Sequence, residues 1–198
     1  MKKLILICIL FLAACGGDKP KYAAIPQGAT VLILGDSLSY GTGANTGEDY
    51  PSLLAKTTGW HIINEGVPGD TSAGGLARLP DLLEEHQPKL LIVELGGNDL
   101  LRQTSPTEIT QNLNSILALA KAQGIQTILV AIPAFSPLKA TFGNLSDHAL
   151  YEEIAKQTNT PLITDVFSDV LSDRALKADQ IHPNAQGYVE VGKKWMKN

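Results

Sequence analysis

The sequence predicts an open α/β sandwich in which about five mainly parallel strands are covered by helices. After residue 30, short apolar runs alternate about five times with longer segments of helical periodicity. The apolar runs are hydrophobic on both faces, as expected for central strands of a parallel sheet. A length of 198 residues, with 44% hydrophobic and 18% charged positions, suits one globular domain.

Five segments are the predicted strands, and each is a short run rich in Val, Leu and Ile. Because parallel strands are joined by right-handed crossovers, the intervening segments should be helices that pack on the sheet. The predicted strands are VLILG (31–35), HIIN (61–64), KLLIVELG (89–96), IQTILVAI (125–132) and PLIT (161–164).

The clearest helix is predicted over residues 106–123. Its start is marked by Ser105 and Glu108, which form a capping box, and Gly124 is placed to end it. One face of this segment is apolar and the opposite face is polar. The apolar face carries Ile109, Leu113, Ile116, Leu117 and Ala120.

The other helices are less regular. Residues 72–86 have an apolar face, but Pro80 should divide this segment into two short helices or kink it, because proline cannot donate a backbone hydrogen bond. Further helices are expected near 49–58, 145–158 and 183–196.

The first residues differ from the rest and are predicted to direct export. Residues 1–14 combine two lysines with an apolar run of about eleven residues, which fits a signal peptide and is shorter than the ~20 residues of a spanning helix. A short anchor or a poorly cleaved signal is the alternative. Leu12 to Cys15 resemble a bacterial lipobox, so Cys15 is expected to carry lipid. Residues 15–29 are predicted to be a lipidated N-terminus and tether, and 30–198 the domain.

The charge balance argues against a nucleic-acid partner. The formal charge is -4, and the longest basic cluster is only Lys19-Pro20-Lys21. Loss of residues 1–14 removes two lysines and gives -6, so membrane association should come from the lipid at Cys15 rather than from the protein surface. Cys8 would leave with the signal, so no disulfide is expected. The spacing of Cys and His indicates no metal site.

Glycines and polar residues follow the predicted strands, where ligands bind in parallel sheets. Each group alone has an ordinary explanation, because Asp and Ser cap helices, glycine forms turns and a histidine before proline can start a helix. The groups are Gly35 to Ser37, Gly66 to Ser72, Gly96 to Asp99 and Asp179 to Pro183.

Together these residues supply the parts that acyl transfer needs. Ser37 offers a hydroxyl nucleophile, His182 a base for its proton, and Asp179 a carboxylate to hold the imidazole. The side chain of Asn98 and the backbone N–H groups of Gly69 and Ser37 can donate to an oxyanion. A glycine at position 69 would leave room for the substrate oxygen.

The blocks GDSLS, GVPGDTS, GGND and DQIHP resemble those of the SGNH (GDSL) hydrolase family, in the same order and from residue 31 to the end of the chain. Residues 69–99 are particularly similar to its secreted bacterial branch of thioesterases, lysophospholipases and arylesterases. The resemblance implies a flavodoxin-like, three-layer α/β/α fold, with Ser37, Asp179 and His182 as triad. It also implies Ser37, Gly69 and Asn98 as oxyanion donors.

The expected function is hydrolysis of carboxylic esters or thioesters of single acyl chains by an exported, lipid-anchored monomer that needs no cofactor. Phe135, Leu138 and Phe142 are expected to wall an apolar acyl pocket, and Ser39 to Gly47 to form a flexible rim. Two alternatives remain open. One is an O-acetylesterase acting on polysaccharide or peptidoglycan, and the other is a surface lipoprotein that binds ligands without catalysis.

Overall fold

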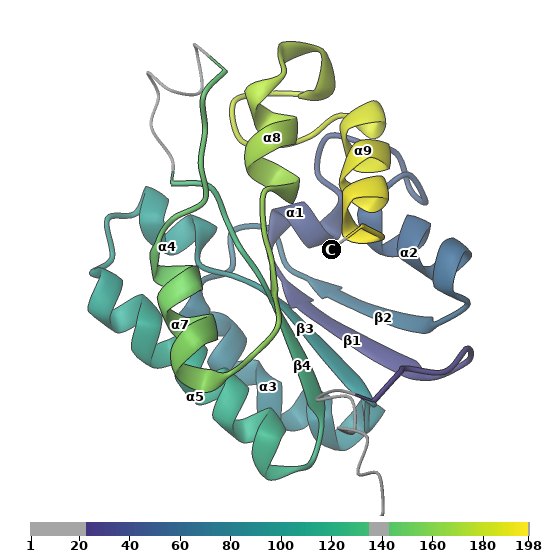
Figure 1. The fold of residues 1–198 in the computed structure, drawn as a ribbon, viewed down its shortest axis with the longest axis vertical. Helices are drawn as coiled ribbons and strands as arrows, with labels where there is room; N and C mark the ends of the chain where they lie inside the picture. The colour runs from purple at the N-terminus through teal and green to yellow at the C-terminus, as the bar shows by residue number, and fades with distance from the viewer. Residues whose placement is uncertain (1–22, 135–142, 198) are drawn as a thin grey trace, which may run out of the picture.

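The five strands form one parallel sheet, with helices on both faces (Figure 1). The structure is a computed structural model that describes residues 23–134 and 143–197. The strand order is β2-β1-β3-β4-β5, so β1 and β3 are central and the predicted α/β sandwich is confirmed. The strands are β1 (Thr30–Gly35), β2 (His61–Gly66), β3 (Leu90–Glu94), β4 (Gln126–Val130) and β5 (Leu162–Ile163).

The longer helices form two layers. On one face α3 (Ser72–His86) packs against α5 (Pro106–Ala122), which packs against α7 (Leu150–Thr158). The other face is covered by α2 (Tyr50–Thr58), α8 (Val166–Ser172) and α9 (Ala185–Trp195) (Figure 1). The short connecting helices are α1 (Ser37–Tyr40), α4 (Gly97–Leu101) and the 3₁₀ helix Arg174–Leu176.

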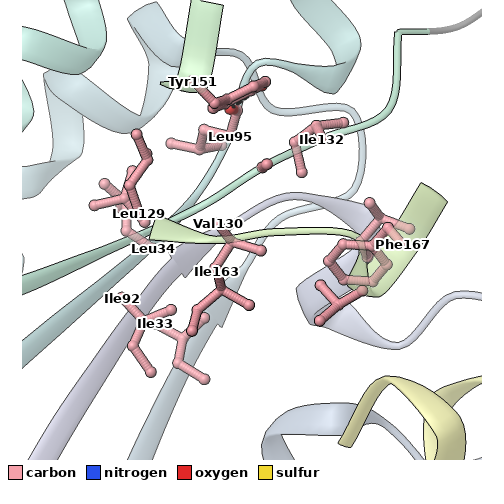
Figure 2. Close-up of a cluster of buried hydrophobic side chains, with 14 of the residues drawn as sticks. Ile33, Leu34, Ile92, Leu95, Leu129, Val130, Ile132, Tyr151, Ile163 and Phe167 are labelled. Carbon is pink, nitrogen blue, oxygen red and sulfur yellow. Dashed lines mark hydrogen bonds between the residues drawn. The ribbon is translucent and has the colours of Figure 1, made fainter. Parts of the chain in front are cut away.

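The core is built from the strands' two faces. Leu34 and Leu129 lie on the face covered by α7, where Tyr151 packs, whereas Val130 and Ile163 lie on the other face with Phe167 of α8 (Figure 2). All four of these strand side chains and both aromatic side chains are buried. This explains why the central strands are apolar at every position rather than at every second one.

Helix α3 runs without interruption through Pro80, so the predicted division into two short helices was wrong, and the alternative of a kink at Pro80 stays a prediction. A proline inside a helix costs about 3 kcal/mol or more, because one hydrogen bond is lost and the ring crowds the preceding turn. Leu79 and Leu83 are both buried beside Pro80, and burial of a leucine side chain contributes about 1.5–3 kcal/mol. Packing of the apolar face therefore offsets the local defect.

The predicted ends of α5 are confirmed, whereas α7 begins later than predicted. The side chain of Ser105 accepts a hydrogen bond from the Glu108 backbone, and α5 ends at Ala122. Helix α7 begins at Leu150 because the residues before it form other contacts. Among these, Asp147 bridges to Pro133.

Part of the predicted tether lies against the domain. Trp60 Nε1 donates a hydrogen bond to the Ile25 carbonyl, and Gln126 Nε2 donates to the Ala23 carbonyl. These contacts lie at the edge of the sheet where β2 and β4 begin. The predicted signal peptide and Cys15 fall outside the described residues. Within 23–134 and 143–197, no helix has both the length and the hydrophobicity to cross a membrane.

Candidate active site

Ser37 stands two residues after the end of the central strand β1, at the first position of α1. The Asp36 carboxylate caps this helix by accepting the Leu38 backbone N–H at 2.9 Å. A first-turn N–H has no acceptor within its own helix, so the Ser37 amide is suited to bind an external oxygen. Gly35 is required at the turn, because a Cβ there would lie 2.1 Å from Ser39 Oγ.

His182 and Asp179 come from the segment before α9 and meet Ser37. His182 Nε2 lies 3.0 Å from Ser37 Oγ, and its Nδ1 lies 2.7 Å from Asp179 Oδ2. A carboxylate only accepts hydrogen bonds, which places the ring hydrogen on Nδ1 and leaves Nε2 to accept from the serine. The structure thus brings all three predicted triad residues together.

The Asp179 carboxylate is held by more than the imidazole. Its Oδ1 accepts the backbone N–H groups of Ile181 and His182, at 2.8 and 2.9 Å. Partial burial opposes the charged form, but the hydrogen bonds from His182 and Ile181 outweigh it, and the pKa of Asp179 is lowered. The residue is therefore ionised at neutral pH and can orient the ring.

Asn98, at the start of α4, points its amide into the same region. Its Nδ2 donates to Asp36 Oδ2 at 3.0 Å and to the Asp70 carbonyl at 2.9 Å. Both amide hydrogens are therefore engaged, and an oxyanion bound by Asn98 would replace one of these acceptors. Gly69 has a φ of +80°, a conformation that favours glycine, and a Cβ there would meet only Arg102, at 3.7 Å.

A buried carboxyl group lies beneath the nucleophile. Glu94, the last residue of β3, is fully buried, and its Oε2 accepts the Ser39 hydroxyl at 2.6 Å and the Ser39 N–H at 3.0 Å. It also accepts the Asp36 N–H at 3.4 Å. Tyr50 extends the network, with its hydroxyl 2.7 Å from Ser39 Oγ. Glu94 thus holds the backbone on both sides of Ser37.

Burial changes the acidity of both carboxyl groups at this turn. It raises the pKa of Glu94 well above its ordinary range, and the neighbouring Asp36 charge adds to the effect. Burial likewise raises the pKa of Asp36 to about 6. The prediction of Ser39 in a flexible rim was wrong, because this side chain is buried on Glu94, although Tyr40 beside it is 61% exposed.

An apolar pocket opens beside Ser37 and His182. Pro133 and Leu145 contribute to its wall, and both belong to the segment 133–147 that carries the predicted acyl-pocket residues. Of that segment, Phe135, Leu138 and Phe142 lie outside the described residues. The apolar side chains that line the pocket are Leu38, Leu101, Ile132, Pro133, Leu145, Leu171 and Ile181. In the described part of the chain, no cluster of three or more His, Cys, Asp or Glu side chains could bind a metal ion.

Two residues of the site were missed in the sequence. Glu94 could have been recognised as unusual, because it is the one acidic residue inside the otherwise apolar run KLLIVELG. Nothing in the sequence marked Arg78, since a charged residue on a helix such as α3 is ordinary. Arg78 donates to the Gly35 carbonyl and to the Asp70 carboxylate. Both residues contact the backbone that supports Ser37 or Gly69.

The hydroxyl, imidazole and carboxylate are hydrogen-bonded in series at the carboxyl edge of a parallel sheet, and this arrangement defines a serine hydrolase. Comparison with known proteins specifies which kind. The chain belongs to the GDSL-like Lipase/Acylhydrolase family, whose sequence profile matches residues 33–189. That match includes all four blocks noted in the sequence.

Individual relatives agree with this assignment. The chain is 40% identical over 164 residues to "Thioesterase 1/protease 1/lysophospholipase L1" of Escherichia coli K12, covering 78% of this chain and 76% of the relative. The crystal structure of TesA matches with a TM-score of 0.76 and 34% identity, over 85% of this chain and 96% of that one. The structure of the esterase EstA from Pseudoalteromonas, inhibited by monoethylphosphonate, matches with a TM-score of 0.72 and 28% identity. The match covers 86% of this chain and 100% of that one.

The raised pKa of Glu94 predicts a pH-dependent stability. Above the ordinary value near 4.5, the unfolded chain loses this proton while the folded protein keeps it. Stabilisation by the neutral acid is therefore complete below that pH, and it falls by up to about 1.4 kcal/mol per pH unit as the pH rises toward the folded-state pKa. The Glu94→Gln variant has no carboxyl proton at this position that could be lost. Its free energy of unfolding in urea should fall less steeply than that of wild type between about pH 5 and 7. Parallel pH curves would contradict the assignment.

Proposed function

We propose that the protein hydrolyses carboxylic esters and thioesters of single acyl chains through an acyl-enzyme on Ser37. The proposal is carried by the contact of 3.0 Å between Ser37 Oγ and His182 Nε2, which puts a base within reach of the hydroxyl proton. The ionised Asp179, 2.7 Å from Nδ1, supports the imidazolium that forms when that proton is taken.

The first half of the reaction transfers the acyl group to the enzyme. Ser37 Oγ attacks the carbonyl carbon while His182 Nε2 takes the hydroxyl proton. The tetrahedral oxyanion accepts hydrogen bonds from the backbone N–H groups of Ser37 and Gly69 and from Asn98 Nδ2. When the intermediate collapses, the bond to the leaving oxygen or sulfur breaks, and His182 returns the proton to the alcohol or thiol.

The second half releases the acid. Water gives a proton to His182 and attacks the acyl carbon of the ester on Ser37. The second tetrahedral intermediate uses the same donors, and its collapse frees the carboxylic acid while His182 reprotonates Ser37 Oγ. His182 carries the proton in every transfer of both halves, and the proton that restores Ser37 comes from water.

The lining of the pocket supports an apolar acyl chain as the group bound. Leu101, Leu145 and Leu171 lie around the space next to Ser37, and apolar contacts stabilise binding by about 0.8 kcal/mol for each buried methylene. Phe135, Leu138 and Phe142 are proposed to extend this wall. The relative from E. coli is named both a thioesterase and a lysophospholipase, which agrees with a single-chain substrate.

A fluorophosphonate probe tests whether Ser37 is the nucleophile, because the probe phosphonylates an activated serine and releases fluoride. Wild type should be labelled and should hydrolyse p-nitrophenyl butyrate, whereas Ser37→Ala should lose both properties. Mass spectrometry of the labelled peptide locates the adduct. Ser115→Ala, an exposed serine on α5, is the matched control and should remain active. An unlabelled, inactive wild type would favour the non-catalytic, ligand-binding alternative.

Truncation of Leu101 tests whether the pocket binds the acyl chain. Leu101 lines the pocket and is 38% exposed, so Leu101→Ala should not disturb the core. Leu101→Ala should raise KM for p-nitrophenyl octanoate at least about fivefold while changing KM for the acetate less than about twofold. Leu119→Ala on α5, equally exposed at 38%, is the control. An enzyme that hydrolyses only the acetate would instead support an O-acetylesterase.

We further propose that the protein is exported and lipid-anchored through Cys15. The lysines at positions 2 and 3, the apolar run after them and the lipobox-like residues before Cys15 support this. Expression in a bacterium fed an alkyne fatty acid should label wild type and leave Cys15→Ser unlabelled, with wild type alone in the membrane fraction. Equal fractionation of the two proteins would contradict the anchor.

A further inference from the structure

Arg78 of α3 reaches the carboxyl edge of the sheet from behind the Ser37 turn. Its Nη2 donates to the Gly35 carbonyl at 3.1 Å and to the Glu65 carbonyl at 2.8 Å. Gly35 ends β1, and Glu65 is next to last in β2. One guanidinium nitrogen therefore joins the ends of two neighbouring strands, and the side chain is only 24% exposed.

The same guanidinium also binds the loop after β2. Arg78 Nε donates to Asp70 Oδ2 at 2.9 Å, and Nη1 lies 3.6 Å from Glu65 Oε2. Asp70 directly follows Gly69, and the Asp70 carbonyl accepts Asn98 Nδ2 at 2.9 Å. Arg78 is thus linked to the residue that borders Gly69 and orients Asn98.

We propose that Arg78 is the positioning residue of the oxyanion hole. It holds the segments that carry all three donors: Ser37 through the Gly35 carbonyl, and Gly69 and Asn98 through Asp70. This role rests on the proposed function. Donors of this kind work because they are fixed before the reaction begins, and a displacement of about 1 Å costs roughly 100-fold in rate.

The contacts require arginine rather than any cation. Nε and Nη2 address different partners from one rigid plane, whereas lysine ends in a single nitrogen on a flexible stem. A lysine could reach Asp70 or the two carbonyls, but not both sets at once. Arg78→Lys therefore keeps the charge and removes the geometry, which separates positioning from electrostatic attraction.

The test compares wild type, Arg78→Lys and Arg78→Ala in the hydrolysis of p-nitrophenyl butyrate. Both variants should lose about 10- to 100-fold in kcat while KM changes less than about twofold, because the donors act on the transition state. Millimolar methylguanidinium should restore part of the kcat of Arg78→Ala. Lys156→Ala removes an exposed cation paired with Glu152 on α7, and it should leave kcat unchanged with or without methylguanidinium.

The outcomes separate the two proposals. An active wild type with a fully active Arg78→Lys would overturn the role of Arg78 alone. A wild type that neither hydrolyses the ester nor reacts with the fluorophosphonate would overturn the proposed function and this role with it. Circular dichroism checks folding. If neither arginine variant folds, Asp70→Asn replaces them, since it weakens the link to the loop from the other end. Asp70→Asn with wild-type kcat would then overturn the proposal.

Discussion

The contact between Ser37 Oγ and His182 Nε2 is the interaction on which the rest of the site depends, and it joins residues 145 positions apart. It exists only because the loop after α1 packs closely on the segment before α9. Gly43, with a φ of +98°, allows this approach, since a Cβ there would lie 2.3 Å from the Pro183 carbonyl oxygen. The hydroxyl of the buried Tyr188 donates to the Thr42 carbonyl at 2.9 Å and fixes the same approach from α9.

The fold contributes stability that the site itself does not supply. Glu94 and Asp36 are carboxyl groups buried close to each other, and burial disfavours the charged form of each. The apolar side chains of β1 and β3 that precede this turn are buried, with Leu34 and Val93 showing no exposed surface. The free energy gained by burying these apolar side chains therefore offsets the cost of burying the carboxyl groups at the turn. Sequences often depart from local rules at functional sites for this reason.

The sequence predicted the strands, and also that Ser37, Asp179 and His182 lie together, for a common physical reason. Strands that are buried on both faces leave a continuous apolar run, and a site at their carboxyl ends leaves polar residues directly after each run, as Ser37 and Asn98 show. The apolar runs alone do not give the strand order, because a run does not record its neighbours; the observed order is the one that the resemblance to a flavodoxin-like fold implies. Arg78 could not be identified either, since its partners lie at residues 35, 65 and 70 and meet only in the folded protein. Local propensity failed at Pro80, where tertiary packing prevails.

The two missed residues, Glu94 and Arg78, have complementary tasks at the turn after β1. Where β1 leaves the sheet, the backbone N–H groups of Asp36 and Ser39 need acceptors outside the ladder, whereas the Gly35 carbonyl still accepts the Val67 N–H at 3.1 Å and takes a second donor from Arg78. Glu94 takes the N–H groups of Asp36 and Ser39, while Arg78 gives hydrogen to the Gly35 carbonyl. A carboxyl side chain can accept several hydrogen bonds, and a guanidinium group carries several N–H donors in one rigid plane. Glutamate and arginine therefore suit these two tasks. The turn can therefore be sharp and rigid, while the Ser37 hydroxyl is left to contact His182 at the pocket.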